Sequence, residues 1–486
     1  MSNSITNLEP KNVWKHFHSL TQIPRPSKHE EAAVDFVKNF GKTLGLETIV
    51  DEVGNVIIRK PATAGMENRK GIILQGHLDM VPQKNSDKTH DFTKDPIEAY
   101  VDGEWVTANG TTLGADNGIG VAAAMAALED KSLVHGPIEG LFTIDEETGM
   151  TGAFNLKPGV LKGDILINLD SEDEGELYVG CAGGVDANIQ LKYKEEVTPE
   201  NYQFSKLSLT GLKGGHSGMD ISSGRANSIK LLFRFLRHAE KEFGIRISSI
   251  DGGSLRNAIP REAFVVLGVP KSNYSALEQA VNNQVKVYKD EFSAVEPDLD
   301  FQIQKVDAPK NVIDSKAQWS IIRAVFGCPN GVIRMSDSMP GLVETSSNLA
   351  RVYSENGFIY TQCLLRSSVD TSKEALAEKI ASVFEMAGAE IEFTGAYPGW
   401  KPNLNSSILK VMSDVYNKNW GKVPEIKAIH AGLECGILGG IYPNLEMISF
   451  GPTIRYPHSP DEKVKIDTVD MFWRFLVEVL KNAPQK

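Results

Sequence analysis

Several short apolar segments of this 486-residue sequence end in histidine or in acidic residues, and this pattern limits the possible folds. The segments and the residues that follow them are 72–74 with His77 and Asp79, 138–144 with Glu146 and Glu147, 164–169 with Asp170, and 447–450 with His458. Short continuous apolar runs are typical of strands buried on both faces of a parallel sheet. Because the carboxyl ends of parallel strands meet at one edge of the sheet, we expect the polar side chains to gather there. The pattern therefore predicts an α/β fold with a polar site at the strand ends.

A glycine-rich loop, Gly110–Gly120, carries a further acidic residue, Asp116, at its centre. The alanine-rich segment 121–128 that follows is expected to form a helix packed closely against the sheet. Glycine-rich loops often bind phosphate, but this one matches neither the P-loop pattern nor the dinucleotide-binding pattern. A carboxylate at the centre of the loop favours a cation as its ligand.

The composition argues against several classes of protein. A formal net charge of -12, without a run rich in Lys and Arg, argues against a nucleic-acid-binding surface. No apolar run reaches the roughly 20 residues needed to span a bilayer, and the first residues do not resemble a signal peptide. The four cysteines form no C-x-x-C pair, so neither a thiolate metal site nor a disulfide framework is expected. We therefore expect a cytoplasmic protein that binds neither nucleic acid nor membrane.

The length of the chain predicts more than one domain, because a single hydrophobic core rarely serves 486 residues. Residues 185–397 alternate strand-like segments with amphipathic helical segments, whereas the strand ends described above lie on either side of this region. We expect one domain formed by 1–184 together with 398–486, and an inserted α+β domain formed by 185–397.

A helix is predicted near the beginning of the chain. Ser27 and Glu30 have the spacing of a capping box, in which the serine caps the first turn. Apolar residues recur at helical spacing from Ala33 to Leu44, and the helix is expected to end near Gly45.

The polar residues at the strand ends have the chemistry of metal ligands. The candidate ligands are two imidazoles and three carboxylates: His77, Asp116, Glu147, Asp170 and His458. Nitrogen and oxygen ligands suit zinc, or cobalt and manganese, and five groups are too many for one catalytic zinc with an open position. They suit two cations if one carboxylate bridges the pair. Asp79 is placed to orient His77, and Glu146 to act as a base towards a water molecule, because neighbouring side chains point to opposite sides.

Eight longer motifs are spread along the whole chain. They are HLDM at 77–80, GADNG at 114–118, DEETGM at 145–150, NLDSEDEGE at 168–176, GLKGGHSG at 211–218, LRNAIPREA at 255–263, HAGLECG at 430–436 and GPTIRYPHSPDE at 451–462. Through them the sequence resembles the co-catalytic di-zinc exopeptidases of the aminoacylase and carboxypeptidase type. Each motif alone is weakly specific, but the set is highly specific. The resemblance implies a catalytic domain with a mixed, mostly parallel central sheet, and an inserted α+β domain that serves as a lid and forms a homodimer.

The resemblance also implies a role for each candidate residue of the metal site. Asp116 would bridge two Zn²⁺ ions per subunit, with Co²⁺ or Mn²⁺ able to substitute. His77 and Asp170 would complete one site, and Glu147 and His458 the other. The remaining implied features are Asp79 as the group that orients His77, Glu146 as the general base and then acid, and a cis peptide bond between Asp116 and Asn117.

Four positions of this sequence match substrate-binding positions of the family: His216, Asn257, Arg366 and Gly432. The resemblance implies that His216 faces the developing oxyanion and that Arg366 holds a terminal carboxylate with its two-pronged guanidinium. Considered without the resemblance, His216 could be a turn residue and Arg366 could pair with a nearby acid.

The function implied by the resemblance is metal-dependent hydrolysis of dipeptides, including Xaa-His and β-alanyl-histidine substrates, by a metal-bridging water that Glu146 activates. The same centre could instead remove an N-acyl group or trim longer peptides. A metal-binding or dimerisation module without turnover is disfavoured, because such a site has no use for the unliganded Glu146 beside the ligand Glu147. A two-metal phosphoesterase is also disfavoured, because the inserted domain offers no cluster of basic residues for phosphate.

Overall fold

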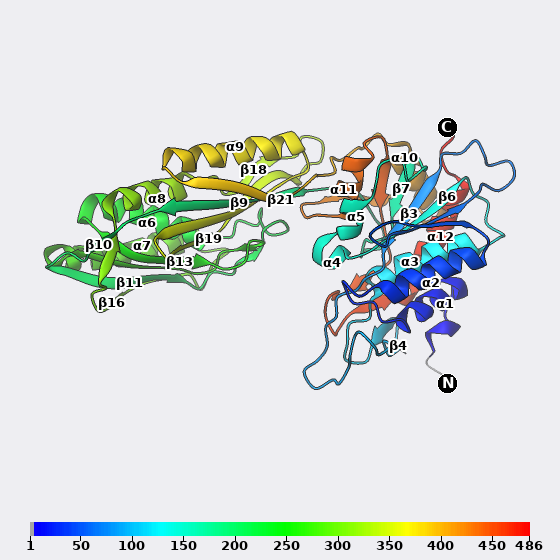
Figure 1. The fold of residues 1–486 in the computed structure, drawn as a ribbon, viewed down its shortest axis with the longest axis horizontal. Coiled ribbons are helices and arrows are strands. Elements are labelled where there is room, and N and C mark those ends of the chain that lie inside the picture. The colour runs from blue at the N-terminus through cyan, green and yellow to red at the C-terminus, as the bar shows by residue number, and fades with distance from the viewer. Residues whose placement is uncertain (1–3) are drawn as a thin grey trace. The chain divides into compact units, whose positions relative to one another are not determined.

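The computed structural model describes residues 4–486, which divide into two compact units (Figure 1). Unit 1 comprises the chain up to Gly180 together with Trp400–Ala428 and Leu433–Lys486. Unit 2 comprises Cys181–Gly399 and Ile429–Gly432. Unit 2 thus takes in the short segment Ile429–Gly432, which lies far along the chain from the rest of it and outside the insert expected from the sequence.

Unit 1 is built on an eight-stranded mixed sheet. In spatial order its strands are β1 (Glu47–Val50), β2 (Val56–Lys60), β6 (Ile138–Thr143), β3 (Ile72–His77), β7 (Ile165–Asn168), β23 (Glu446–Ser449), β8 (Glu176–Cys181) and β22 (Glu425–Ile429). The central strands β6, β3, β7 and β23 run parallel to one another, whereas β2 and β8 pair antiparallel at either side of them. Every residue of β3, β6 and β7 is buried, as the continuous apolar runs predicted. The predicted α/β class is confirmed.

The helices of unit 1 include one that is packed unusually closely against the sheet. The helices are α1 (Lys11–Thr21), α2 (Glu31–Thr43), α3 (Ala115–Glu129), α4 (Glu146–Gly149), α5 (Thr151–Asn155), α10 (Ser407–Trp420), α11 (Glu434–Ile441) and α12 (Ile466–Lys481). Residues 117–128 of α3 are all buried, and their small side chains let the helix lie directly on β3. A small four-stranded sheet formed by β24 (Ile454–Arg455), β25 (Lys463–Lys465), β5 (Trp105–Ala108) and β4 (Ala99–Asp102) completes the unit.

The beginning of α2 differs from the sequence-based prediction of a capping box. The helix begins directly after Glu30, and no side chain caps its first turn. Ser27 Oγ instead donates to Asp79 Oδ2 at 2.8 Å, and Glu30 Oε1 accepts the backbone N–H of Asp145 at 3.1 Å. The predicted capping role of Ser27 is wrong because its hydroxyl is engaged by Asp79, far along the chain, and the helix begins after Glu30.

Unit 2 is built on a nine-stranded antiparallel sheet. Its strands are β16 (Asp300–Lys305), β11 (Tyr202–Thr210), β15 (Ala263–Pro270), β13 (Arg246–Gly253), β19 (Val343–Glu355), β20 (Phe358–Ser367), β9 (Gly183–Lys192) and β21 (Glu390–Tyr397), with β18 (Gly331–Met335) paired to β19. The helices α6 (Ser228–Phe243), α7 (Tyr274–Glu291), α8 (Ser315–Gly327) and α9 (Asp370–Met386) pack against the sheet (Figure 1). Two short ladders pair β10 (Glu195–Val197) with β17 (Asn311–Ile313) and β12 (Gly215–His216) with β14 (Ala258–Ile259). Helices and strands share one continuous hydrophobic core, which confirms the expected α+β character.

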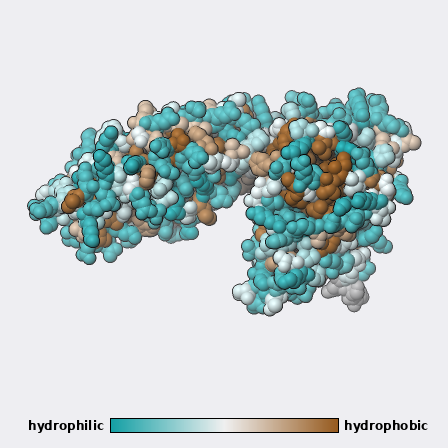
Figure 2. All heavy atoms as spheres, viewed as in Figure 1, coloured by the Kyte–Doolittle hydropathy of each residue, from teal (hydrophilic) through white to brown (hydrophobic). Residues whose placement is uncertain are grey.

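The surface in view is mostly hydrophilic on both units, interrupted by a hydrophobic area on unit 1 (Figure 2). Among residues 4–486, no helix combines the length and the apolar character needed to cross a membrane.

Candidate metal centre

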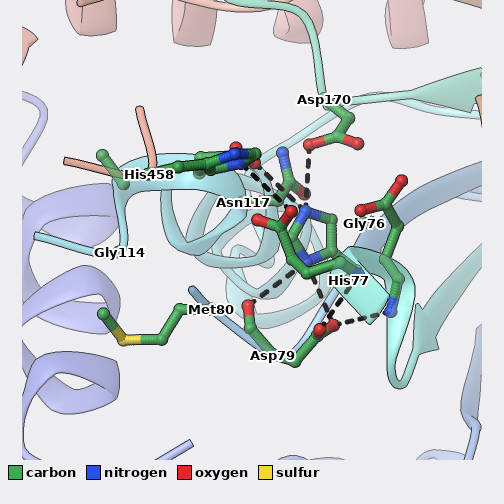
Figure 3. A network of polar contacts seen from close by, with 12 residues as sticks. Gly76, His77, Asp79, Met80, Gly114, Asn117, Asp170 and His458 are labelled. Carbon is green, nitrogen blue, oxygen red and sulfur yellow. Dashed lines mark hydrogen bonds and ion pairs between the residues drawn. The ribbon is translucent and has the colours of Figure 1, made fainter. Parts of the chain in front are cut away.

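His77 is the last residue of β3 and lies at the carboxyl edge of the central sheet, where its side chain is only 1% exposed. Its Nε2 atom lies 3.1 Å from Asp116 Oδ1 and 3.3 Å from Asp170 Oδ1. Its Nδ1 atom lies 3.3 Å from Asp79 Oδ1, so that the ring stands between Asp79 and Asp170 (Figure 3). A carboxylate on one ring nitrogen fixes the direction in which the other nitrogen points. Asp79 therefore aims His77 Nε2 at the other two carboxylates.

The second oxygen of Asp116 faces a second imidazole. His458 Nε2 lies 3.2 Å from Asp116 Oδ2 and 3.0 Å from Glu147 Oε2. One group of possible ligands is thus His77, Asp116 and Asp170, and another is Asp116, Glu147 and His458; within each group the ligand atoms lie within 4.8 Å of one another. Asp116 belongs to both groups and presents one oxygen to each. The five candidate ligands could therefore hold two cations bridged by Asp116.

Asp116 is held in place by an unusually close approach of α3 to the sheet. The peptide bond between Asp116 and Asn117 is cis, as the family resemblance implied. The Asn117 side-chain amide donates to the carbonyl of Leu169 at 2.7 Å. A Cβ atom at Gly76 would lie 2.3 Å from Asn117 Oδ1, and one at Gly120 would lie 2.4 Å from the Leu169 carbonyl. Glycine at positions 76 and 120 therefore leaves the space in which β3, α3 and the end of β7 meet.

Asp79 also positions the two glutamates that follow β6. Its Oδ1 atom accepts the backbone N–H of Glu146 at 3.0 Å, and its Oδ2 atom accepts that of Glu147 at 3.2 Å. The side chain of Glu147 points to His458, as described above. One carboxylate oxygen of Glu146 lies within 4.8 Å of ligand atoms of His77 and Glu147. Glu146 therefore adjoins the candidate ligands without belonging to either group of three that contains Asp116.

Burial and the crowding of carboxylates shift the pKa values of the groups in the site. Burial raises the pKa of Glu146 well above its ordinary value and raises the pKa of Asp170 to about 7. Hydrogen bonds that His458 donates to Asp116 and Glu147 raise the pKa of His458 to about 11. Protons are therefore retained at positions where a cation would otherwise balance the carboxylates.

Two ligand atoms of the proposed set lack a hydrogen-bond partner within residues 4–486. These atoms are Glu147 Oε1 and Asp170 Oδ1, and both are buried. Buried carboxylate oxygens are ordinarily hydrogen-bonded, paired with a charge or bound to a metal. Asp170 Oδ1 has the imidazole of His77 at 3.3 Å, whereas Glu147 Oε1 has no partner among the described residues. Together with the mixed imidazole and carboxylate donors, these two buried oxygens fit a pair of divalent cations.

A row of buried polar side chains crosses the sheet next to the candidate ligands. Gln75 and Thr143 donate to Glu434 Oε2 at 2.6 and 2.8 Å. Asn168 donates to Gln75 Oε1 at 2.6 Å, and Ser449 donates to Asn168. Gln75 and Asn168 stand two positions before His77 and Asp170, and because side chains alternate along a strand, each shares the face of that ligand. The row thus links β6, β3, β7 and β23 directly behind the ligands, and burial raises the pKa of Glu434 to about 7.

The four predicted substrate-binding residues lie in unit 2. His216 directly precedes Ser217 in the chain, and each of the other three contacts Ser217 or Tyr397. Arg366 donates to Ser217 Oγ at 3.4 Å and to the Tyr397 hydroxyl at 3.1 Å. A Cβ atom at Gly432 would lie 3.1 Å from the Tyr397 ring. Asn257 is exposed and contacts the cluster through its backbone carbonyl, which accepts the N–H of Ser217 at 2.8 Å. Within residues 4–486, Arg366 forms no ion pair with a carboxylate, so its charge is available to an anion.

His216 is oriented by the turn that follows it. Its Nδ1 atom accepts the backbone N–H groups of Gly218 and Met219 at 3.2 and 3.1 Å. The neutral ring therefore carries its proton on Nε2, where it can donate to an oxyanion. His430 lies next to this turn, since a Cβ atom at Gly218 would lie 2.0 Å from the His430 carbonyl. Burial, together with the charge of Arg366, lowers the pKa of His430 to about 4.

Several residues that shape the two sites were not predicted from the sequence. Glu434 and His430 stand inside the HAGLECG motif, so their position in a matched motif was a signal that could have been used. Ser27, Gln75 and Tyr397 stand outside every motif, and only their tertiary contacts identify them.

The fold and the paired ligand groups agree with a known class of enzyme. The chain belongs to peptidase family M20/M25/M40, whose family model matches residues 73–482, and the resemblance inferred from the motifs is confirmed. It is 47% identical over 482 residues, 99% of both chains, to the cytosol non-specific dipeptidase of Escherichia coli (strain K12). The solved structure of aminoacylhistidine dipeptidase from Vibrio alginolyticus is 50% identical, with a TM-score of 0.96 over 100% of this chain and 99% of that chain. An aminopeptidase from Bacillus cereus shares the fold at 17% identity, with a TM-score of 0.61 over 98% of this chain and 99% of that chain.

Cation binding should release protons and should strengthen as the pH rises through 7. The reason is that a ligand must be deprotonated to bind, whereas the pKa of His458 is raised to about 11 and that of Asp170 to about 7. Calorimetric titration of the cation-free protein with Zn²⁺, in buffers of different ionisation enthalpy, measures the protons released. The substitution His238→Gln, at an exposed position of unit 2, is a control that should leave the number of protons released unchanged. Zinc binding without proton release at pH 7 would contradict the proposed ligand set.

Proposed function

We propose that this chain hydrolyses dipeptides, including Xaa-His and β-alanyl-histidine substrates, in a reaction that depends on two divalent cations. The observation that carries the proposal is that Asp116 presents one oxygen to His77 and the other to His458. The names of the E. coli and Vibrio relatives, which are both dipeptidases, support the substrate class.

The proposed ligands are His77, Asp116 and Asp170 for one cation and Asp116, Glu147 and His458 for the other. We propose zinc as the ion, with cobalt or manganese able to substitute, because the donors are imidazole nitrogens and carboxylate oxygens. When bound, such a pair of ions acidifies water and polarises the scissile carbonyl.

Glu146 is the proposed general base and then acid. Its carboxylate adjoins the ligands, and its backbone is fixed by the hydrogen bond to Asp79. Because burial raises the pKa of Glu146, its carboxylate is a stronger base than a free glutamate, and it is proposed to take a proton from the attacking water and return it to the leaving amine. Asp79 acts indirectly in this scheme, since it orients His77 and holds both glutamates.

The substrate-binding residues are proposed to belong to the inserted domain, 185–397, and to the adjoining segment that carries Gly432. Arg366 is proposed to bind the terminal carboxylate of the dipeptide, because its guanidinium forms no ion pair with a carboxylate in the described part of the chain, 4–486. His216 is proposed to donate to the oxyanion through Nε2, and Asn257 to contribute at the same position. We further propose that the inserted domain works as a lid, which is required for turnover.

A homodimer formed through unit 2 is proposed as well. Strand β18 pairs only with β19 among the described strands, and it exposes Val332, Ile333 and Met335 by 37%, 37% and 43%. Trp319 and Phe326 on α8 are also exposed, by 54% and 43%. An apolar strand edge is a surface that a second copy can cover. Light scattering of the purified protein tests this assembly, and a monomeric mass would contradict it.

The cytoplasm is the proposed location, supported by the name of the E. coli relative.

The purified protein, loaded with zinc, should cleave β-alanyl-histidine and other dipeptides faster than a free tripeptide or an N-acetyl amino acid. Chelation should abolish the activity, and readdition of Zn²⁺ or Co²⁺ should restore it, because the cations activate the water. Amino-acid analysis of the products distinguishes the three substrate classes. Full activity in a sample shown by elemental analysis to lack metal would contradict the proposal.

Glu146→Gln should lower kcat by roughly 10²- to 10⁴-fold, which is the usual contribution of a positioned base, while both cations stay bound. The matched variant is Glu147→Gln, which should lose a cation because Glu147 is a proposed ligand. Elemental analysis and kinetics on the same samples separate the two residues. If Glu146→Gln lost metal in proportion to activity, Glu146 would be a ligand and the assignment would be wrong.

Arg366→Ala should lower kcat/KM on a dipeptide by roughly 10- to 100-fold, since a charge-assisted hydrogen bond contributes about 1.5 to 3 kcal/mol. A C-terminally amidated dipeptide should be affected much less, because it has no carboxylate for Arg366 to bind. Arg246→Ala, which removes another partly buried arginine of unit 2, is the control and should spare both substrates. Equal losses on both substrates would show that Arg366 supports the fold instead.

A further inference from the structure

Two oppositely charged side chains, Arg25 and Glu462, are buried close to the candidate ligands in unit 1. Each is only 2% exposed. Neither belongs to the proposed ligand set, and neither is used in the reaction described above. Burying a charge is costly unless it is fully compensated, so the contacts of these two residues indicate what they do.

Glu462 accepts four backbone N–H groups from one stretch of chain. The donors are Leu113 at 2.8 Å, Gly114 at 3.0 Å, Ala115 at 2.7 Å and Asp116 at 3.2 Å. An ionised carboxylate suits four such donors, because it has lone pairs for all of them and carries no proton of its own. Glu462 follows His458 by four residues. It therefore ties the segment that carries His458 to the loop that carries Asp116.

Arg25 connects a third segment, the one that carries His77, to the same loop. Its Nη1 atom donates to the carbonyls of Leu78 and Asp79 at 2.9 and 3.0 Å, and its Nη2 atom donates to the carbonyl of Gly114. Leu78 directly follows His77. The guanidinium thus joins the end of β3 to the loop that carries Asp116.

The two charges meet at a single peptide group. The carbonyl of Gly114 accepts from Arg25, and the N–H of the same peptide, which belongs to Ala115, donates to Glu462. The peptide dipole is thereby aligned between a positive and a negative charge. Residue 114 must be glycine here, because its φ is +69° and a Cβ atom would lie 2.6 Å from Arg25 Nη2. This explains the first glycine of the GADNG motif.

We propose that Arg25 and Glu462 are a pair of positioning residues that sets the cation affinity of the site. Together they hold the backbone of the segments bearing His77, Asp116 and His458, so that the two oxygens of Asp116 face different imidazoles. The pair fixes the ligands before a cation arrives, which lowers the ordering cost of binding. The proposal rests on the ligand set proposed above.

The test is the zinc affinity of the cation-free protein, measured by competition with a chromophoric chelator. Glu462→Gln keeps the size of the side chain but replaces one acceptor oxygen with an N–H₂ group that faces N–H donors. The variant should bind zinc roughly 10- to 100-fold more weakly than the unaltered chain, which is the usual effect of losing a group that orients metal ligands. Its activity should recover towards that of the unaltered chain at saturating zinc.

Glu139→Gln is the matched control. Glu139 is also a buried carboxylate, 5% exposed, and accepts the backbone N–H of Lys162 at 2.7 Å and a hydrogen bond from Arg59 at 3.1 Å. It is the second residue of β6 and therefore lies at the end of the strand away from the ligands. The control should lose thermal stability but keep its zinc affinity, which separates positioning from general support of the fold.

Arg25→Lys is a second variant that carries the test if Glu462→Gln does not fold. A lysine keeps the charge, but its single ammonium group cannot reach all three carbonyls, so zinc affinity should again fall. In the double variant Arg25→Lys with Glu462→Gln, the loss should be smaller than the product of the single losses, because both residues act on one peptide. Unchanged zinc affinity in folded Glu462→Gln or Arg25→Lys would overturn the pairing. Failure of the unaltered chain to bind zinc would instead overturn the proposed function.

Discussion

Negative charge crowded at the carboxyl edge of the central sheet must be balanced, and most of unit 1 is arranged around this requirement. Asp116, Glu147 and Asp170 approach two imidazoles within about one hydrogen-bond length, and further carboxylates stand behind them. Burial raises the pKa of Asp170 to about 7 and that of Glu172 to about 8, because like charges and low polarity disfavour the ionised forms. Such a cluster is stable when protons or cations compensate it. The same property that makes the cluster costly to bury makes it suited to holding two metal ions.

The fold meets the requirement by fixing the backbone around each ligand. Asp79 binds the His77 ring and the N–H groups of both glutamates that follow β6. Arg25 and Glu462 hold the peptide groups next to three ligands, and the row that ends at Glu434 ties four parallel strands together behind them. In each case a charged or amide side chain is satisfied mainly by groups of the ligand-bearing segments. The ligand-bearing segments are therefore held together by hydrogen bonds from side chains that are not themselves proposed ligands.

Unit 2 presents a positive group, whereas unit 1 presents a cluster of negative groups. Its antiparallel sheet and four helices form a core of their own, and Arg366 lies near the buried end of β20 beside Tyr397. The guanidinium is held by hydroxyl groups and, among the residues that the structure describes, forms no ion pair with a carboxylate. Its charge also explains part of the lowered pKa of His430, which stays neutral next to it. These features favour recognition of an anionic group such as the carboxylate of a peptide.

The sequence by itself determined which side chains stand at the strand ends. Apolar runs that stop at His77, Glu147 and Asp170 predict parallel strands, and parallel strands bring their carboxyl ends to one edge whatever the loops between them do. The candidate ligands could therefore be named in advance, and the structure places all five in two groups that share Asp116. The capping box predicted for α2 is wrong, because Ser27 and Glu30 have the right local spacing but the Ser27 hydroxyl binds Asp79 and the helix begins only after Glu30.

Only the tertiary structure decided how those side chains are held. Glu462 reaches the loop at Asp116 across 346 residues of sequence, and Arg25 reaches Gly114 across 89. No local pattern encodes such contacts, because each is made with backbone groups that every residue possesses. The segment 429–432 likewise joins unit 2 although it begins at the last residue of β22, a strand of the unit 1 sheet. Local periodicity specifies strands and their ends, whereas the pairing of buried charges with distant peptide groups emerges only when the whole chain is packed.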